Sequence, residues 1–426
     1  MILININAEK IKDIEKKHYE YTKELICDKI NRKLKEIEDN CSDEFGKSFV
    51  EFLKELLDTP DSLLKKIILM DKENLLNFPI SIENDCSFDF INKYLDLQCK
   101  IKKCEDEINK YENEIPYFRK NDMNTGRLNK IENLCELIQK FALDNNSYFE
   151  KSGKYKNKGE FKKDLNDLKI RITDKDNKKI ALVKKYLLEI FDYDSFVKET
   201  DKWSAYFLAS YLDINVCPYC NRSYVNTIIS KTGKARPELD HFYPKSIYPF
   251  FALTLYNLIP SCHICNFKKG QKDTVKERIL YPYSEQFGKG VKFTARLYNE
   301  KDLNVKNKLP EKDLHDIKFF FGNSNNFKIE IDETNEKIKN CKETFLLEDF
   351  YQFHKKDVRK IIKKAIVYTS SRIDELYNNY CPDLFESREE IVQMIFSNYD
   401  DEENLNTEIL SKLTKDICDD LDINTK

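Results

Sequence analysis

Two Cys-x-x-Cys pairs constrain the fold of this 426-residue chain more than any other feature. Cys217 pairs with Cys220 and Cys262 pairs with Cys265, and 41 residues lie between the two pairs. Each pair offers two thiolates from one tight turn, and four thiolates complete the tetrahedral coordination of a structural zinc ion. The separation exceeds the roughly 15 to 20 residues of a common zinc ribbon, so the insert must form a small structure of its own. We expect zinc to supply folding free energy on the order of 10 kcal/mol or more.

The remaining cysteines show no pattern of pairing. The chain has 13 cysteines, and the nine outside the two pairs are scattered singly. An odd total and irregular spacing argue against a disulfide framework, so we expect nine free thiols that act mostly as small buried hydrophobes. Two unrelated thiol pairs are the alternative to a zinc cluster. A redox pair is disfavoured, because no thioredoxin-like βαβ pattern surrounds either one. We expect His263, inside the second pair, to point outward.

Composition places the chain among globular proteins. Charged residues make up 35% and hydrophobic residues 41%, which is too apolar for general disorder, and only nine glycines favour helix. The length suits two or three domains. No apolar run approaches the roughly 18 residues that span a bilayer, and the apolar patch at the start is too short for a signal peptide. We therefore expect a cytoplasmic protein.

The pattern of the sequence divides it into three regions. Apolar residues at spacings of three and four predict helices through residues 1–195, including one over 94–115, whereas the basic stretch 151–167 is predicted as a loop. Residues 196–290 hold both cysteine pairs and several strand-like runs. Residues 291–426 begin with two short strand patterns, "VKFTARLYN" and "FKIEID", and continue as helices, with an acidic loop near 400. The predicted fold is α+β and mostly α-helical, with helical N- and C-terminal regions around a central zinc-stapled module.

The insert between the cysteine pairs places polar residues at the ends of predicted elements. "PELDHF" predicts a strand that ends at His241, with Asp240 beside it. The run up to "LIPS", which contains Asn257, predicts a connection and a return strand, and "CHICNFKKGQK" predicts a helix that carries Asn266. On that helix, Asn266 is turned about 100° from Cys265, so it can face the hairpin while the sulfur faces the zinc. We therefore expect Asp240, His241 and Asn266 to converge.

These residue types suit hydrolysis of a phosphodiester bond. Asp240 and the side-chain carbonyl of Asn266 are hard oxygen ligands, which Mg²⁺ or Mn²⁺ prefers. Such an ion stabilises charge on the phosphoryl oxygens and on the leaving oxygen. His241 is the candidate general base, since neutral imidazole is well populated near neutral pH. We expect Asn257 to tie the hairpin backbone together and to hold His241 in orientation.

The stretch "ELDHFYPKSIYPFFALTLYNLIPSCHICNFKKG" resembles the HNH, or ββα-metal, endonuclease family over residues 217–285. The resemblance implies that Asp240 and Asn266 bind the catalytic metal, that His241 is the general base and that Asn257 stabilises the hairpin. Asn266 stands where many members have the final histidine. Gly270 occupies the position of a further histidine ligand found in some members, which weakens the case for a transition metal.

Several short motifs in and around this stretch are most similar to those of zinc-knuckle HNH nucleases of bacterial anti-phage defence systems. "CPYC", "HFYPKS" and the combination "NLIPSC", "CN" and "KG" carry this similarity, and the Septu nuclease subunit is the relative it suggests. That subunit works beside an SMC-like ATPase. The similarity therefore implies a DNA-cleaving effector that acts with a partner ATPase.

Charge in the central module favours a polyanionic substrate. Residues 217–290 contain 11 lysines and arginines against 5 acidic residues, a net charge of +6, whereas the whole chain carries −3. The candidates for contact with backbone phosphates are Lys245, Lys268, Lys269, Lys272 and Arg222. We expect a metal-dependent DNA endonuclease. The alternatives are an HNH ribonuclease that cleaves RNA or tRNA, and a non-catalytic, zinc-dependent adaptor that binds nucleic acid.

Overall fold

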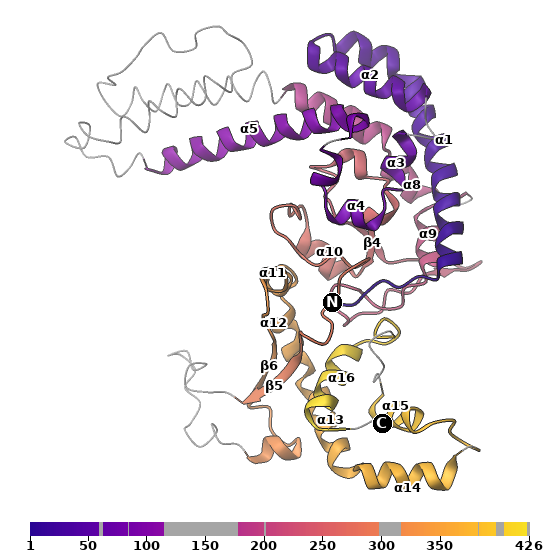
Figure 1. Ribbon diagram of the computed structural model, residues 1–426, viewed down its shortest axis with the longest axis vertical. Coiled ribbons are helices and arrows are strands. Elements are labelled where there is room, and N and C mark those ends of the chain that lie inside the picture. The colour runs from indigo at the N-terminus through magenta and orange to yellow at the C-terminus, as the bar shows by residue number, and fades with distance from the viewer. Residues whose placement is uncertain are drawn as a thin grey trace, which may run out of the picture. The chain divides into compact units, whose positions relative to one another are not determined.

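The computed structural model describes residues 1–58, 63–83, 85–114, 178–199, 202–297, 317–381, 383–397 and 404–423. Helices dominate these residues, and three small two-stranded antiparallel sheets accompany them, so the mostly helical α+β prediction is confirmed for them (Figure 1). None of the described helices combines the length and the apolar character that crossing a membrane requires. The predicted loop at 151–167 lies outside the described residues, as does most of the acidic segment near 400.

Contacts within the chain define two compact units. Unit 1 comprises Met1–Ile26, Leu64–Pro79 and Phe191–Lys426, and unit 2 comprises Cys27–Leu63 and Ile80–Ile190. The division into three domains at 195 and 290 stays a prediction.

Unit 2 is helical and has an aromatic core. It contains the C-terminal part of α1 (Ala8–Asn40), α2 (Glu44–Asp58), α5 (Asp89–Glu114) and the helical residues 178–190. Phe90 of α5 stacks on Phe52 of α2 with ring centroids 4.9 Å apart. The helix predicted over 94–115 is confirmed by α5, which begins five residues earlier. Two 3₁₀ turns lead into α5, η2 (Ile80–Ile82) and η3 (Cys86–Phe88).

Unit 1 packs short helices around the central module. These are the N-terminal part of α1, α3 (Lys65–Ile68), α4 (Lys72–Leu76), α8 (Tyr193–Lys198) and α9 (Ala205–Leu212). Asp71 and Asp192 cap the N-termini of α4 and α8 by accepting hydrogen bonds from backbone N–H groups three residues on. The buried hydroxyl of Thr254 donates to the carbonyl of Ile67 in α3 at 2.8 Å, which links α3 to the central module.

The predicted hairpin and helix are confirmed. β3 (Glu238–His241) pairs antiparallel with β4 (Leu258–Ser261), and the register sets Asp240 opposite Ile259. Two 3₁₀ turns, η6 (Pro249–Phe251) and η7 (Leu255–Asn257), lie in the connection between the strands. α10 (His263–Lys269) follows β4 after Cys262 (Figure 1). The helix contacts β3. It stops at Gly270, whose φ of +52° is a conformation that a side chain disfavours.

A second hairpin lies within the insert, between the first cysteine pair and β3. β1 (Ile228–Ile229) pairs with β2 (Lys234–Ala235), and all four residues are exposed. This hairpin therefore buries nothing of its own, unlike β4, whose residues are all buried.

The C-terminal part of unit 1 begins with the two predicted short strands. β5 (Phe293–Leu297) pairs with β6 (Phe327–Ile331), in which every second residue is buried, as expected of a strand with one solvated face. Asp416 accepts a hydrogen bond from the backbone N–H of Phe293, which ties a late helix to β5. The other elements are η10 (Ile317–Phe321), α11 (Glu336–Phe345), α12 (Leu347–Tyr351), η11 (Gln352–His354), α13 (Lys355–Val367), α14 (Ser370–Tyr380), α15 (Arg388–Phe396) and α16 (Ser411–Asp420).

Candidate functional site

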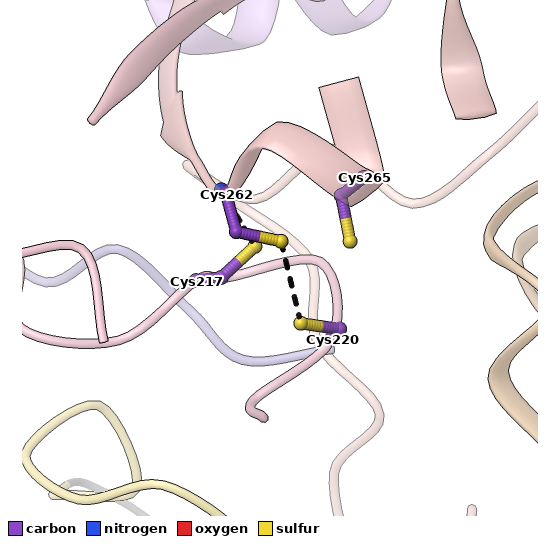
Figure 2. Close-up of side chains that lie close together, drawn as sticks. All are labelled: Cys217, Cys220, Cys262 and Cys265. Carbon is purple, nitrogen blue, oxygen red and sulfur yellow. Dashed lines mark hydrogen bonds between the residues drawn. The ribbon is translucent and has the colours of Figure 1, made fainter. Parts of the chain in front are cut away.

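The two cysteine pairs meet. Figure 2 shows the four sulfurs of Cys217, Cys220, Cys262 and Cys265 turned toward one another. All four sulfur atoms lie within 4.8 Å of one another. The sulfurs of Cys220 and Cys262, from different pairs, are 3.9 Å apart. A tetrahedral zinc ion with bonds of about 2.3 Å separates its sulfurs by roughly 3.8 Å. The cluster could therefore bind zinc, as the spacing predicted. No disulfide forms among the cysteines whose side chains the structure describes.

The protonation of the four thiols is uneven. Burial raises the pKa of Cys217, and hydrogen bonding among the thiols raises the pKa of Cys265. Hydrogen bonds from Cys217 lower the pKa values of Cys220 and Cys262, which are thereby favoured as thiolates. Four thiolates would repel one another in so small a volume, so a cation is needed to hold all four deprotonated.

Backbone contacts fix the first cysteine pair in place. The buried hydroxyl of Tyr351 donates to the carbonyl of Cys220 at 2.8 Å, and Ile2 donates its N–H to the carbonyl of Pro218 at 2.9 Å. Asn221 adopts a left-handed φ of 52°, and its side-chain amide donates to two carbonyls near the start of α16. These contacts come from three distant parts of unit 1, so the knuckle is anchored on several sides.

Asp240 is buried and is held by two side chains. Its Oδ2 atom accepts a hydrogen bond of 2.7 Å from the hydroxyl of Tyr219, which lies between Cys217 and Cys220. The ammonium of Lys269, from the last turn of α10, lies 3.1 Å from the same oxygen. Lys269 and Asp240 are 0% and 3% exposed, so this ion pair sits in an environment where attraction between charges is weakly screened.

His241 is held in one tautomer. Its Nε2 atom lies 3.0 Å from the carbonyl oxygen of Ala252, and because a carbonyl only accepts, Nε2 carries the proton. Nδ1 is then the nitrogen with a lone pair. Burial lowers the pKa of His241 to about 3, so the ring is neutral at physiological pH. The ring of Tyr193 packs edge-on against the imidazole, with centroids 4.5 Å apart.

The side chain of Asn257 hydrogen-bonds to backbone groups of the connection between β3 and β4. Its Oδ1 atom accepts from the N–H of Tyr243 at 2.7 Å, and its Nδ2 atom donates to the carbonyls of Tyr243 and Phe251. This is the hairpin-tying part of the role predicted for Asn257. In the part of the chain that the structure describes, the ring of His241 is held by the carbonyl of Ala252 rather than by the side chain of Asn257.

Asn266 lies beside Glu238 at the start of β3. Its Nδ2 atom donates to Oε2 of Glu238 at 2.6 Å, and since a carboxylate only accepts, the amide oxygen must face the other way. Oε1 of Glu238 lies 2.7 Å from Nδ1 of His263, whose side chain is 77% exposed, as the sequence predicted. Glu238 therefore bridges two residues of α10 and fixes how Asn266 presents its oxygen.

Of the basic residues predicted to contact phosphates, some are exposed to solvent and others already pair with side chains of the protein. Lys268 is exposed on α10. Lys245 pairs with Asp194 at 3.3 Å, and Lys272 pairs with Glu277 at 3.0 Å, both with side chains more than a third exposed. The guanidinium of Arg222 donates to Nε2 of His354 at 3.1 Å. Lys269 faces Asp240 inside the protein rather than the surface, which weighs against its predicted contact with phosphates.

Three further side chains contribute to this region. Tyr219 and Glu238 hold the proposed ligands Asp240 and Asn266. Phe267 is 74% exposed on the outer face of α10, where it stacks on His263. The bond from Tyr219 to Asp240 was not predicted, although the position of Tyr219 inside a cysteine pair marks it as part of the knuckle. Nothing in the sequence marks an exposed phenylalanine.

Comparison with known proteins adds one partial similarity. Over 69 residues the chain is 39% identical to the Septu protein PtuB of Bacillus thuringiensis. The matched part covers 16% of this chain and 27% of that relative, so the chain spans about a quarter of the relative's length. No family model matches the chain, and no solved structure matches it.

Proposed function

We propose that this protein is a metal-dependent HNH endonuclease that hydrolyses phosphodiester bonds in DNA. The observation that carries the proposal is that β3 ends in Asp240 and His241 while α10, which carries Asn266, packs beside the same hairpin. Lys269 of α10 reaches both residues, because its ammonium contacts the carboxylate of Asp240 and the backbone carbonyl of His241. Lys269 therefore ties α10 to the end of β3, where Asp240 and His241 lie.

His241 is the proposed general base. The hydrogen bond to Ala252 keeps the proton on Nε2, so Nδ1 is the atom that would accept a proton from the attacking water. Burial keeps the ring neutral near pH 7, and the same low pKa makes the imidazole a weak base on its own. The packing of Tyr193 against the imidazole limits rotation of the ring, so the lone pair keeps one direction.

Asp240 and Asn266 are the proposed ligands of Mg²⁺ or Mn²⁺. The donor set fits a hard cation, because it combines a carboxylate with an amide oxygen that Glu238 turns away from itself. Such an ion, when bound, would stabilise charge on the phosphoryl oxygens and on the leaving 3′-oxygen. Among the described residues, the only group of three or more His, Cys, Asp or Glu side chains able to hold an ion is the cysteine cluster. An ion held by Asp240 and Asn266 would take its remaining ligands from water and substrate oxygens.

The exposed face of α10 supports a nucleic-acid substrate. Phe267 and Lys268 are adjacent and exposed, which places a ring that can stack on a base beside a cation that can meet a phosphate. The partial similarity to the Septu protein PtuB supports a role in anti-phage defence, and we propose that the chain acts there beside an SMC-like ATPase.

A cleavage assay tests the enzymatic part. Zinc-loaded protein is incubated with labelled double-stranded DNA, single-stranded DNA, RNA and tRNA, with Mg²⁺ or Mn²⁺ and with EDTA. We expect metal-dependent cleavage of DNA that His241→Ala abolishes while binding persists. Thr232→Ala is the control, because it changes an exposed residue in the turn of the other hairpin of the insert, away from β3 and α10.

Other outcomes favour the alternatives. Cleavage confined to RNA or tRNA would make the protein a ribonuclease with the same site. Binding without cleavage by the wild-type chain, alone and with its partner ATPase, would make it a non-catalytic adaptor. For the defence role, phage challenge of bacteria that carry the intact system should show protection that His241→Ala removes and Thr232→Ala keeps.

A further inference from the structure

Tyr219 joins the cysteine cluster to the proposed catalytic carboxylate. It lies between Cys217 and Cys220, is 0% exposed, and donates its hydroxyl to Oδ2 of Asp240 at 2.7 Å. A single side chain therefore spans from the zinc knuckle to the end of β3. Among the described residues, Tyr219 is the one member of the two Cys-x-x-Cys segments whose side chain hydrogen-bonds to Asp240.

The ring of Tyr219 has little freedom. It stacks on Phe345 of α11 with centroids 4.5 Å apart and planes 20° from parallel. Its hydroxyl therefore serves as a hydrogen-bond donor to Asp240 whose direction is set by packing.

Two donors from different elements set the position of the carboxylate. Tyr219 approaches Oδ2 from the knuckle, and the ammonium of Lys269 approaches both oxygens, at 3.2 Å and 3.1 Å. A carboxylate accepts at about four lone-pair positions, so these contacts leave room for a further partner. Groups that hydrogen-bond to a metal ligand orient it, and their loss commonly lowers metal affinity about 10- to 100-fold.

We propose that Tyr219 is a positioning residue that holds Asp240 for binding of the divalent cation, and so couples the zinc knuckle to catalysis. This inference rests on the proposed nuclease function. The role is specific to the hydroxyl, since the ring's stacking on Phe345 would serve packing alone. Tyr219→Phe keeps that stacking and removes only the donor.

The test compares Tyr219→Phe with Tyr351→Phe. Tyr351 is also buried, and its hydroxyl also bonds to the knuckle, at the carbonyl of Cys220, but it does not contact Asp240. Mn²⁺ binding to the zinc-loaded proteins is measured by electron paramagnetic resonance, zinc content by elemental analysis, and DNA cleavage as a function of Mn²⁺ concentration.

We expect Tyr219→Phe to keep its zinc, to need about 10- to 100-fold more Mn²⁺ for half-saturation, and to regain cleavage at high Mn²⁺. KM for DNA should stay unchanged, and Tyr351→Phe should bind Mn²⁺ as the wild type does. Wild-type Mn²⁺ affinity in Tyr219→Phe, or parallel loss of zinc and Mn²⁺ in it, would overturn the inference while the nuclease function stands. A wild-type protein that neither binds Mn²⁺ nor cleaves would overturn both.

Discussion

The ammonium of Lys269 lies 2.6 Å from the carbonyl oxygen of His241. This contact locks the last turn of α10 to the end of β3, and the same ammonium neutralises the buried carboxylate of Asp240. Lys269 therefore holds together the two elements from which the candidate site is built. Its burial makes it a structural cation rather than a surface charge.

Replacing Lys269 by methionine should destabilise the protein strongly. The change leaves the Asp240 charge buried without its partner, which costs about 3 to 5 kcal/mol in comparable ion pairs. Urea unfolding followed by circular dichroism measures this loss. Lys268→Met, one residue earlier and exposed, should change the free energy of unfolding by no more than about 0.5 kcal/mol. Equal stability of the two variants would show that the buried pair is not important to the fold.

Zinc should be present at one ion per chain and should be required for folding of the central module. Cys265→Ser removes one of the four ligands and leaves a poorer site, so we expect loss of zinc and of the cooperative unfolding transition. Elemental analysis and thermal unfolding provide the measurements. Cys86→Ser, which changes an exposed cysteine outside the cluster, is the control and should keep both. A chain that folds normally without any zinc would contradict this prediction.

Stability should fall in mildly acidic solution partly through His18. This buried residue donates from Nε2 to the carbonyl of Leu253 at 2.8 Å and accepts at Nδ1 from the indole of Trp203 at 3.1 Å. Both nitrogens are satisfied only in the neutral ring. Burial lowers the pKa of His18 from 6.5 to about 4, so the unfolded chain takes up the proton first as the pH falls.

Protonation of His18 therefore favours the unfolded chain, and acid lowers the free energy of unfolding. The stabilisation is fully present above pH 6.5 and is lost progressively as the pH falls toward about 4. Between neutral pH and about pH 5 the loss from this residue is roughly 2 kcal/mol. His18→Gln, which can still donate to Leu253, should show a correspondingly flatter dependence of unfolding free energy on pH. Identical pH dependence in both proteins would rule out His18 as the cause.

Phe267 should contribute to binding of single-stranded nucleic acid. Its ring is 74% exposed beside Lys268, and stacking of a base on an aromatic ring is worth about 1 to 3 kcal/mol. Phe267→Ala should therefore weaken binding of labelled single strands, measured by fluorescence anisotropy, without changing the Mn²⁺ affinity. Phe353→Ala is the control, because Phe353 is 79% exposed but lies outside the hairpin and helix. Equal weakening in both variants would indicate general rather than site-specific contact.

Much of the structure of the central module could be predicted from the sequence, because it is determined by residues that are close together in the chain. Two Cys-x-x-Cys turns fix four sulfurs, and the strand that ends at His241 is short and bounded by prolines. The hairpin, the helix after Cys262 and the meeting of the sulfurs were all predicted. These features depend on residue types at fixed spacings rather than on distant packing.

The contacts of Lys269 could not be predicted in the same way. A lysine before a glycine at a helix end is usually solvated, and only the packing of β3 against α10 shows that this one is buried. The same applies to the bond from Tyr219 to Asp240, which depends on how the knuckle packs against the hairpin. Long-range placement of this kind leaves no periodic signal in one sequence.

The exposed hairpin of β1 and β2 lies on the stretch of chain that the cysteine cluster closes into a ring. Its tip, at Gly233, has nothing within 4 Å of where a side chain would begin. Extra residues can therefore be accommodated there, because the entropy lost on closing a loop increases only slowly with loop length. That tip is the place to insert a fluorophore tag or a tether that reports on the enclosed residues without deforming them.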